Sequence, residues 1–144
     1  MMAHSIQIVF ACQDPDRLAT FWAAVLGYVL QPPPEGFSSW DEFADTVGIP
    51  IEKRNDISAC IDPDGIGPRL LFERYDGGAA NRRVHVDVNA LGRGLAEEQR
   101  SARLEDERGR LEALGAMFHR EATGMAGEHW YEFHDPEGNW FCVQ

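Results

Sequence analysis

The feature that most constrains the fold of this 144-residue chain is a series of local patterns that occurs twice. In each half, a β-branched strand is followed by an amphipathic helix that ends at a glycine, and later by an Asp-Pro-x-Gly turn with a closing strand. The helices end at Gly27 and Gly115, and the turns occupy residues 62–65 and 135–138. A unit of this kind cannot bury the face of its sheet alone. The duplication therefore predicts a single α+β domain, residues 1–144, built from two similar modules.

The two modules are predicted over about residues 4–76 and about 81–144. Apolar residues recur at helical spacing over 16–26 in the first module and over about 95–114 in the second. Three consecutive prolines, residues 32–34, predict the start of a loop in the first module, because proline cannot continue a β-ladder. This loop and the longer second helix explain why equivalent strands, helix ends and turns are not separated by the same number of residues in the two modules.

The composition excludes several classes of function. The chain has 24 acidic and 13 basic residues, and its formal net charge of −11 would repel nucleic acid and an anionic membrane surface. No apolar run approaches the ~20 residues that a membrane-spanning helix needs, and no export signal is visible at the N-terminus. We therefore expect a cytoplasmic protein with a small-molecule ligand, and no nucleic-acid or membrane partner. Through long-range electrostatic attraction alone, the negative net charge would favour a cationic ligand.

The three cysteines, Cys12, Cys60 and Cys142, include no Cys-x-x-Cys pair. Their odd number and wide spacing fit reduced thiols in a cytoplasm better than a disulfide framework. Each lies among apolar neighbours, where a free thiol usually packs as a small hydrophobic group. Because the local sequence supplies Cys142 with no base, we expect a packed thiol there rather than a nucleophile.

Strand alternation places several polar side chains on one face, because side chains at positions i and i+2 of a strand share a face. In the first strand, two isoleucines form an apolar face and Gln7 lies on the opposite one. In the strand that opens the second module, three valines alternate with His85, Asp87 and Asn89. Glu73 alternates with apolar residues near the end of the first module. These side chains are therefore candidates for a shared polar site.

Aromatic and titratable side chains elsewhere are candidates for binding a ligand: Trp40, Asp87, Trp130, Glu132, His134 and Trp140. Tryptophans provide large contact areas in the walls of a cavity. Trp130, Glu132 and His134 share one face of a strand at 129–134, where Glu132 and His134 form a candidate acid–base pair. The alternative is that this strand lies at the edge of a sheet, with its polar face in water.

Several short motifs in the chain together carry a family resemblance. They are Asp14-Pro15, Phe21-Trp22, Leu26-Gly27, Val84-His85-Val86-Asp87-Val88, Leu114-Gly115-Ala116 and Asp135-Pro136-Glu137-Gly138-Asn139. With these motifs the chain resembles the vicinal oxygen chelate superfamily, in particular its glyoxalase-like branch, which is related to glyoxalases, bleomycin-resistance proteins and extradiol dioxygenases. The resemblance implies two βαβββ modules whose curved mixed sheet surrounds a central cavity, and a homodimer.

In that superfamily, the metal ligands come from the first and last strands of each module. The resemblance therefore implies one divalent ion, Zn, Ni, Mn or Fe, held by Gln7, Glu73, His85 and Cys142. It makes Glu73 the candidate catalytic residue as well. Cys142 stands where a glutamate is frequent in the superfamily, and a thiolate at this position would move the preference away from manganese.

Two functions follow from these expectations. The first is a metal-dependent lyase, isomerase or dioxygenase-type enzyme that acts on a small oxygenated or electrophilic molecule. The second is a metal-free binding protein that sequesters a drug-like or aromatic metabolite, as the bleomycin-resistance relatives do. The sequence neither supports nor excludes a third function, that of a structural or interaction module. Metal binding separates the first two functions.

Overall fold

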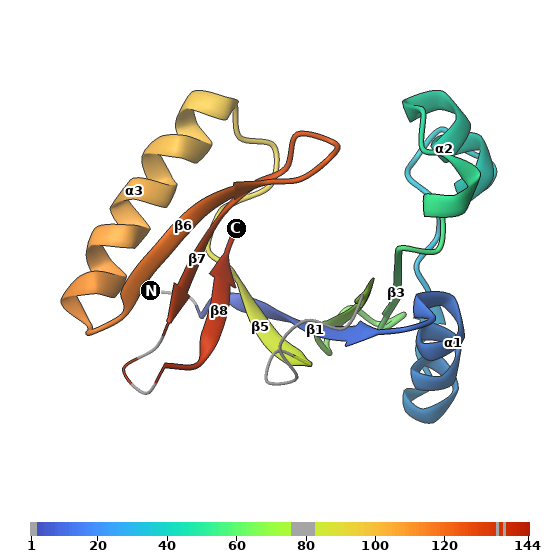
Figure 1. The fold of residues 1–144 in the computed structure, drawn as a ribbon, viewed down its shortest axis with the longest axis horizontal. Helices are drawn as coiled ribbons and strands as arrows, with labels where there is room; N and C mark the ends of the chain where they lie inside the picture. The colour runs from blue at the N-terminus through green and yellow to red at the C-terminus, as the bar shows by residue number, and fades with distance from the viewer. Residues whose placement is uncertain (1–2, 76–82, 135, 137) are drawn as a thin grey trace. The chain divides into compact units, whose positions relative to one another are not determined.

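The computed structural model describes residues 3–75, 83–134, 136 and 138–144 (Figure 1). The chain divides into two compact units. The N-terminal unit is Ile8–Val84, and the C-terminal unit combines Met1–Gln7 with His85–Gln144. The first strand, β1 (Ser5–Cys12), begins in the C-terminal unit and continues in the N-terminal one. The single-domain organisation and the module boundaries expected from the sequence stay predictions.

The N-terminal unit has the order strand, helix and three strands, with a helical insertion. After β1 come α1 (Pro15–Leu26), β2 (Val29–Leu30), α2 (Trp40–Val47), the 3₁₀ turn η1 (Ile51–Lys53), β3 (Ile57–Ile61) and β4 (Arg69–Arg74). The strands follow the order β2-β3-β4-β1 in the sheet. Helix α1 packs on β3 and β4, and buries a core that includes Ala19, Cys60 and Phe72.

Helix α1 begins and ends where the sequence predicts. The Asp14 carboxylate accepts a hydrogen bond from the backbone N–H of Arg17 at 3.2 Å, and Pro15 occupies the first helical position. Gly27 adopts a left-handed conformation with φ of 72°, which ends the helix.

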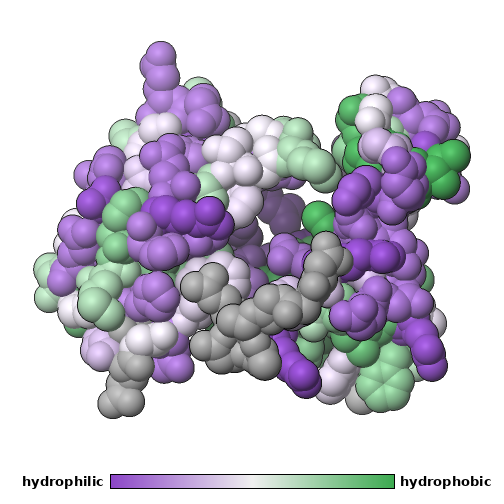
Figure 2. All heavy atoms as spheres, in the orientation of Figure 1, coloured by the Kyte–Doolittle hydropathy of each residue, from purple (hydrophilic) through white to green (hydrophobic). Residues whose placement is uncertain are grey.

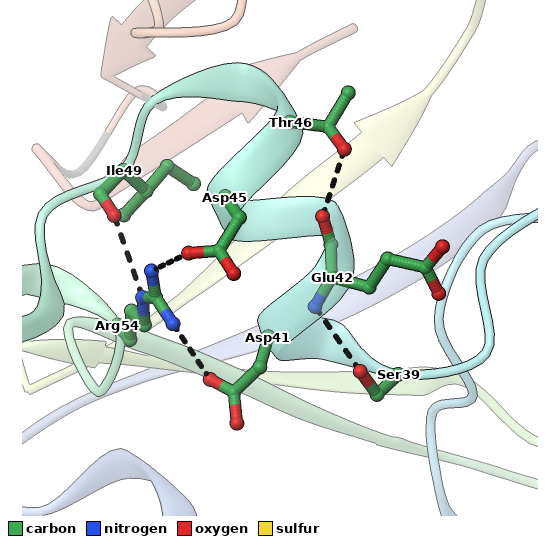
Figure 3. A network of polar contacts seen from close by, with 7 residues as sticks. All are labelled: Ser39, Asp41, Glu42, Asp45, Thr46, Ile49 and Arg54. Carbon is green, nitrogen blue, oxygen red and sulfur yellow. Dashed lines mark hydrogen bonds and ion pairs between the residues drawn. The ribbon is translucent and has the colours of Figure 1, made fainter.

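The segment after the three prolines contains a helix where the sequence analysis predicts only a loop. The Ser39 hydroxyl caps α2 by accepting a hydrogen bond from the backbone N–H of Glu42 at 3.1 Å. Arg54 then ties the segment together by donating to the carboxylates of Asp41 and Asp45 and to the carbonyl of Ile49 (Figure 3). The prolines therefore end β2, and the capping serine starts a new helix a few residues later.

The C-terminal unit repeats the same order without the insertion. It contains β5 (Val84–Asn89), α3 (Glu97–Ala113), β6 (Met117–Thr123), β7 (His129–His134) and β8 (Trp140–Val143). Its strand order, β5-β8-β7-β6, matches β1-β4-β3-β2 of the N-terminal unit. Strand β5 pairs with β8 in parallel, whereas β8, β7 and β6 pair antiparallel. The duplication that the sequence predicts is therefore present in the topology.

Helix α3 covers one face of this second set of strands (Figure 1). The core between them contains Leu104 of α3 with Tyr131, Phe133 and Val143 of the strands. The outer surface of α3 is mainly hydrophilic (Figure 2), as its acidic and basic residues predict. Strand β7 lies between β8 and β6, so the alternative of an edge strand at 129–134 is wrong.

No helix in the described part of the chain is long and apolar enough to cross a membrane.

Candidate metal centre

A row of polar side chains crosses the sheet of the C-terminal unit, on the face opposite the α3 core. Asp87 of β5 pairs with Cys142 of β8, Cys142 with Glu132 of β7, and Glu132 with Arg120 of β6. Residues that pair directly across a sheet project to the same side. Gln7 of β1 extends the row, because its side chain contacts Asp87. One face of the sheet therefore collects groups from five strands.

Most of this polar row is buried. Gln7, Asp87, Glu132 and Cys142 are 3–5% exposed. Burying a polar or charged group is costly unless it finds a partner. The groups of this row must therefore find their polar partners mainly among one another.

Asp87 is the centre of the best-defined contacts. The side-chain amide of Gln7 donates a hydrogen bond to Asp87 Oδ2 at 2.5 Å. On the other side, Asp87 Oδ1 lies 3.2 Å from His85 Nε2. This second contact lacks hydrogen-bond geometry, and Oδ1 accepts no hydrogen bond from any residue that the structure describes. A buried carboxylate oxygen is thus held next to an imidazole nitrogen while its own hydrogen-bonding capacity is unused.

His85, Asp87 and Cys142 form a group that fits a metal ion. One ligand atom of each residue lies within 4.8 Å of the other two. Imidazole nitrogen, carboxylate oxygen and thiolate sulfur are all ligands of Zn²⁺, and a thiolate disfavours the oxygen-preferring ions. A cation bound here would also interact with Oδ1 of Asp87, which accepts no hydrogen bond from the described residues. The donor set therefore fits zinc better than manganese.

Trp140 holds the imidazole of His85 in place. The two rings have centroids 3.9 Å apart with an interplanar angle of 40°. The His85 side chain is only 8% exposed. Trp140 lies two residues before Cys142 on β8, so it faces the same side of the sheet. The indole therefore packs against one of the candidate metal ligands, and its role in binding a ligand stays a prediction.

The structure brings together only part of the metal site that the resemblance implies. His85 and Cys142 lie together, and Gln7 is adjacent through its contact with Asp87. Glu73 lies on β4 of the N-terminal unit, and its participation stays a prediction. Asp87, which the sequence analysis places in the ligand site, supplies the carboxylate among the candidate metal ligands. The alternation of His85 and Asp87 along one strand is the sequence signal for this pairing.

Glu132 and His134 have different partners, although they share one face of β7. The Glu132 carboxylate accepts two hydrogen bonds from Arg120, at 2.8 Å from Nε and 3.1 Å from Nη2. Burial raises the pKa of Glu132, but the bonds and charge of Arg120, aided by Trp130 and His119, bring the pKa below its ordinary value. The ring of His134 packs against that of His119, with centroids 5.3 Å apart. Glu132 is therefore an ionised partner of Arg120, and its action with His134 as an acid–base pair stays a prediction.

Two further tryptophans, Trp130 and Trp40, are candidates for binding a ligand in the sequence analysis, and this role stays a prediction. Trp130 is half-buried on β7, on the same face as Glu132. Trp40 begins α2 in the N-terminal unit, where its indole N–H donates to the carbonyl of Gln31 at 2.8 Å. Arg120 is the residue that the sequence analysis misses. Its position depends on the pairing of β6 with β7, which the local sequence does not reveal.

Two βαβββ units, with polar groups gathered on the sheet face opposite a helix, define the glyoxalase-like class of α+β proteins. The sequence profile of the glyoxalase-like domain family matches residues 7–144, so the chain belongs to this family. The match confirms the resemblance to the vicinal oxygen chelate superfamily. A comparison with curated proteins finds no match.

Solved structures of similar fold cover nearly the whole chain. The NAD-dependent benzaldehyde dehydrogenase from Legionella pneumophila matches with a TM-score of 0.57 and 9% identity, over 96% of each chain. A methylmalonyl-CoA epimerase variant from Streptomyces coelicolor, in complex with 2-nitronate-propionyl-CoA, gives 0.55 and 12%, over 99% of this chain and 96% of the other. The methylmalonyl-CoA epimerase from Mycobacterium tuberculosis gives 0.50 and 16%, over 98% and 85%. At these identities the likeness supports the fold alone.

Proposed function

We propose that the C-terminal unit binds one divalent metal ion, zinc by preference, through His85, Asp87 and Cys142, and that this site acts on a small oxygenated molecule. The observation that carries the proposal is the convergence of three ligand atoms of suitable chemistry within 4.8 Å on two neighbouring strands. The reaction class is that of a metal-dependent lyase, isomerase or dioxygenase-type enzyme. Membership of the glyoxalase-like family supports the same conclusion.

Each residue of the group has a distinct role in the proposal. Gln7 orients the Asp87 carboxylate through its 2.5 Å hydrogen bond, and Trp140 keeps the His85 ring in position. Residues that fix ligands in this way normally raise metal affinity. When bound, the ion would polarise a carbonyl or hydroxyl oxygen of the ligand as a Lewis acid. Glu73 remains the predicted catalytic carboxylate, and the homodimer and the cytoplasmic location remain predictions.

One observation favours the second candidate, a metal-free binding protein. Gln7 and His85 both contact Asp87 directly, so these three buried groups stabilise one another without an ion. In that case Trp130 and Trp140 would supply the contact area for an aromatic or drug-like metabolite. Metal binding distinguishes the two candidates.

The decisive experiment is a titration of chelator-treated protein with Zn²⁺, Ni²⁺, Mn²⁺ and Fe²⁺, followed by calorimetry and by metal analysis. We expect one zinc ion per chain, and a loss of binding in His85→Gln and Asp87→Asn. Cobalt should give a thiolate charge-transfer band that Cys142→Ser abolishes. The matched control, Cys12→Ser, alters a thiol of the N-terminal unit and should leave both results unchanged. If none of the four metals binds, the metal proposal fails and the binding-protein candidate takes its place.

A further inference from the structure

Arg120 is held in an unusual way at the outer strand of the C-terminal unit. Its side chain is 63% exposed, whereas its partner, the Glu132 carboxylate, is 4% exposed. Two parallel hydrogen bonds, from Nε and Nη2, fix the guanidinium against this buried carboxylate. Paired bonds of this kind set the orientation of the guanidinium as well as its position. A surface arginine, normally mobile, is therefore preorganised.

The same arrangement leaves part of the guanidinium available. An arginine has five N–H donors, and the pairing with Glu132 uses two of them. No further hydrogen bond joins Arg120 to the described residues. The remaining donors lie on the side of the group away from the buried carboxylate, which is its exposed side. They form a fixed set of donors facing solvent.

Two histidines, His119 and His134, belong to the same two strands as this ion pair. The pairing of β6 with β7 is irregular between Phe118 and Arg120, and this irregularity falls at His119. The His119 ring packs edge-on against that of His134, and His119 contributes to lowering the pKa of Glu132. His134 shares a face of β7 with Glu132, so Arg120, His119 and His134 place three nitrogen-bearing side chains on this part of the sheet. The chain otherwise carries a large excess of acidic residues.

This cluster adjoins the candidate metal centre. Glu132 is the direct cross-strand partner of both Arg120 and Cys142. His134 is likewise the partner of Trp140, whose ring packs on His85. Arg120 on β6 and Cys142 on β8 lie on either side of β7, two strand spacings or about 10 Å apart, and a small molecule bound at the metal centre could span this distance.

We infer that Arg120, with His119 and His134, forms a subsite for an oxyanion, a carboxylate or phosphate, carried by the small molecule that the metal centre binds. A planar, fixed guanidinium recognises such groups through paired hydrogen bonds. The net charge of −11 repels anions at long range, so the attraction must be local and direct. The inference rests on the proposed function in one respect: that the site next to Arg120 is a metal centre that binds the same small molecule.

The test uses the side-chain Nε–H signal of Arg120 in ¹⁵N NMR spectra of the whole chain, with and without zinc. The probes are benzoate, its uncharged isostere benzamide, and inorganic phosphate. We expect benzoate or phosphate to shift the signal in a saturable manner and benzamide to leave it unchanged. The anion that binds with the higher affinity, benzoate or phosphate, indicates whether the natural ligand carries a carboxylate or a phosphate. An Nε–H signal that responds to neither anion overturns the inference.

Two matched arginine variants test whether the anion binds at Arg120. Arg120→Gln should weaken anion binding at least tenfold, while Arg110→Gln should not change it. Arg110 is a suitable control because it makes the same forked pairing, with Glu107 on α3. If Arg120→Gln fails to fold because Glu132 is left unpaired, the double variant R120M/E132L removes the pair together and gives the same test. Equal anion binding by wild type and the Arg120 variants contradicts the subsite.

The two proposals can fail separately. Zinc binding without any anion response at Arg120 would overturn the subsite and leave the metal centre intact. An anion response at Arg120 in a wild-type chain that binds none of the four metals would keep the subsite and overturn the metal centre.

Discussion

At the residue scale, Asp87 and Cys142 supply two of the three donor groups of the candidate metal centre. The superfamily resemblance leads one to expect a carboxylate on the last strand, where this chain has Cys142. The structure shows that Asp87, directly across from Cys142, brings a buried carboxylate to the same group. The candidate carboxylate ligand can thus come from Asp87 on β5 instead of from the position of Cys142 on β8, because these two paired side chains share one face of the sheet. In the proposed site, the thiolate of Cys142 favours zinc over manganese.

Gln7 provides the first prediction at this scale. Gln7→Ala removes the hydrogen bond that orients Asp87, and loss of such a supporting contact typically costs about 10- to 100-fold in metal affinity. We expect this reduction in zinc affinity, measured by competition with a chromophoric chelator. Gln13→Ala is the control, since the Gln13 side chain donates only to a backbone carbonyl in the N-terminal unit. Unchanged zinc affinity in Gln7→Ala would remove Gln7 from the site.

Glu132 provides a prediction about pH. Its pKa is lowered in the folded chain, so its ionised form stabilises the fold above its unfolded pKa. This stabilisation is lost as the pH falls through the lowered pKa. Glu132→Gln should therefore cost about 1–3 kcal/mol at pH 7, and progressively less in acid.

Urea unfolding of wild type and Glu132→Gln across this pH range measures the difference. Asp106→Asn, at an exposed position on α3, should show little effect at any pH. A destabilisation by Glu132→Gln that does not change with pH would contradict the assignment of an ionised carboxylate.

At the scale of the elements, the repeated strand order follows from local signals that act twice. Asp14, Pro15 and Gly27 define α1, and Gly115, with φ of 100°, follows α3 in the same way. Helix α2 shows the limit of this reasoning. The prolines correctly predict the end of β2, but the helix that follows depends on Ser39 as a cap and on Arg54, which lies later in the chain.

Gly109 allows a direct test of α3. This glycine is inside the helix, its φ is negative, and a Cβ added to it would meet no atom within 4 Å. Gly109→Ala should therefore stabilise the protein by about 0.5–1 kcal/mol, measured as an increase in the urea midpoint. Gly115→Ala should do the opposite, because its positive φ strains any L-residue. Destabilisation by Gly109→Ala would mean that α3 packs differently at this position.

At the scale of the whole molecule, the two units share a topology but differ in what their sheets carry. The polar row and all three candidate metal ligands belong to the C-terminal unit. The N-terminal unit carries Glu73 and the helical insertion α2. The duplication has thus been followed by divergence, with the group of metal ligands in only one copy among the described residues.

Metal binding should be visible in the stability of the whole chain. A ligand that binds only the folded state stabilises it by about 2.7 kcal/mol at a free concentration of 100 times its Kd. We expect zinc to raise the free energy of unfolding by this amount, and a chelator to reverse the change. The Asp87→Asn variant should show no such increase. A zinc-dependent increase of equal size in that variant would place the metal elsewhere.

The sequence by itself determined the duplicated α+β fold, the ends of α1 and the alternation that puts Gln7 and His85 on polar faces. These features depend on residues close together in the chain, so local conformational preferences suffice to predict them. Only the tertiary structure decided that Asp87 lies directly across from Cys142, and that Arg120 is fixed on a buried Glu132. These contacts depend on which strands pair and in which register, and that is set by the burial of Tyr131, Phe133 and Val143 against α3.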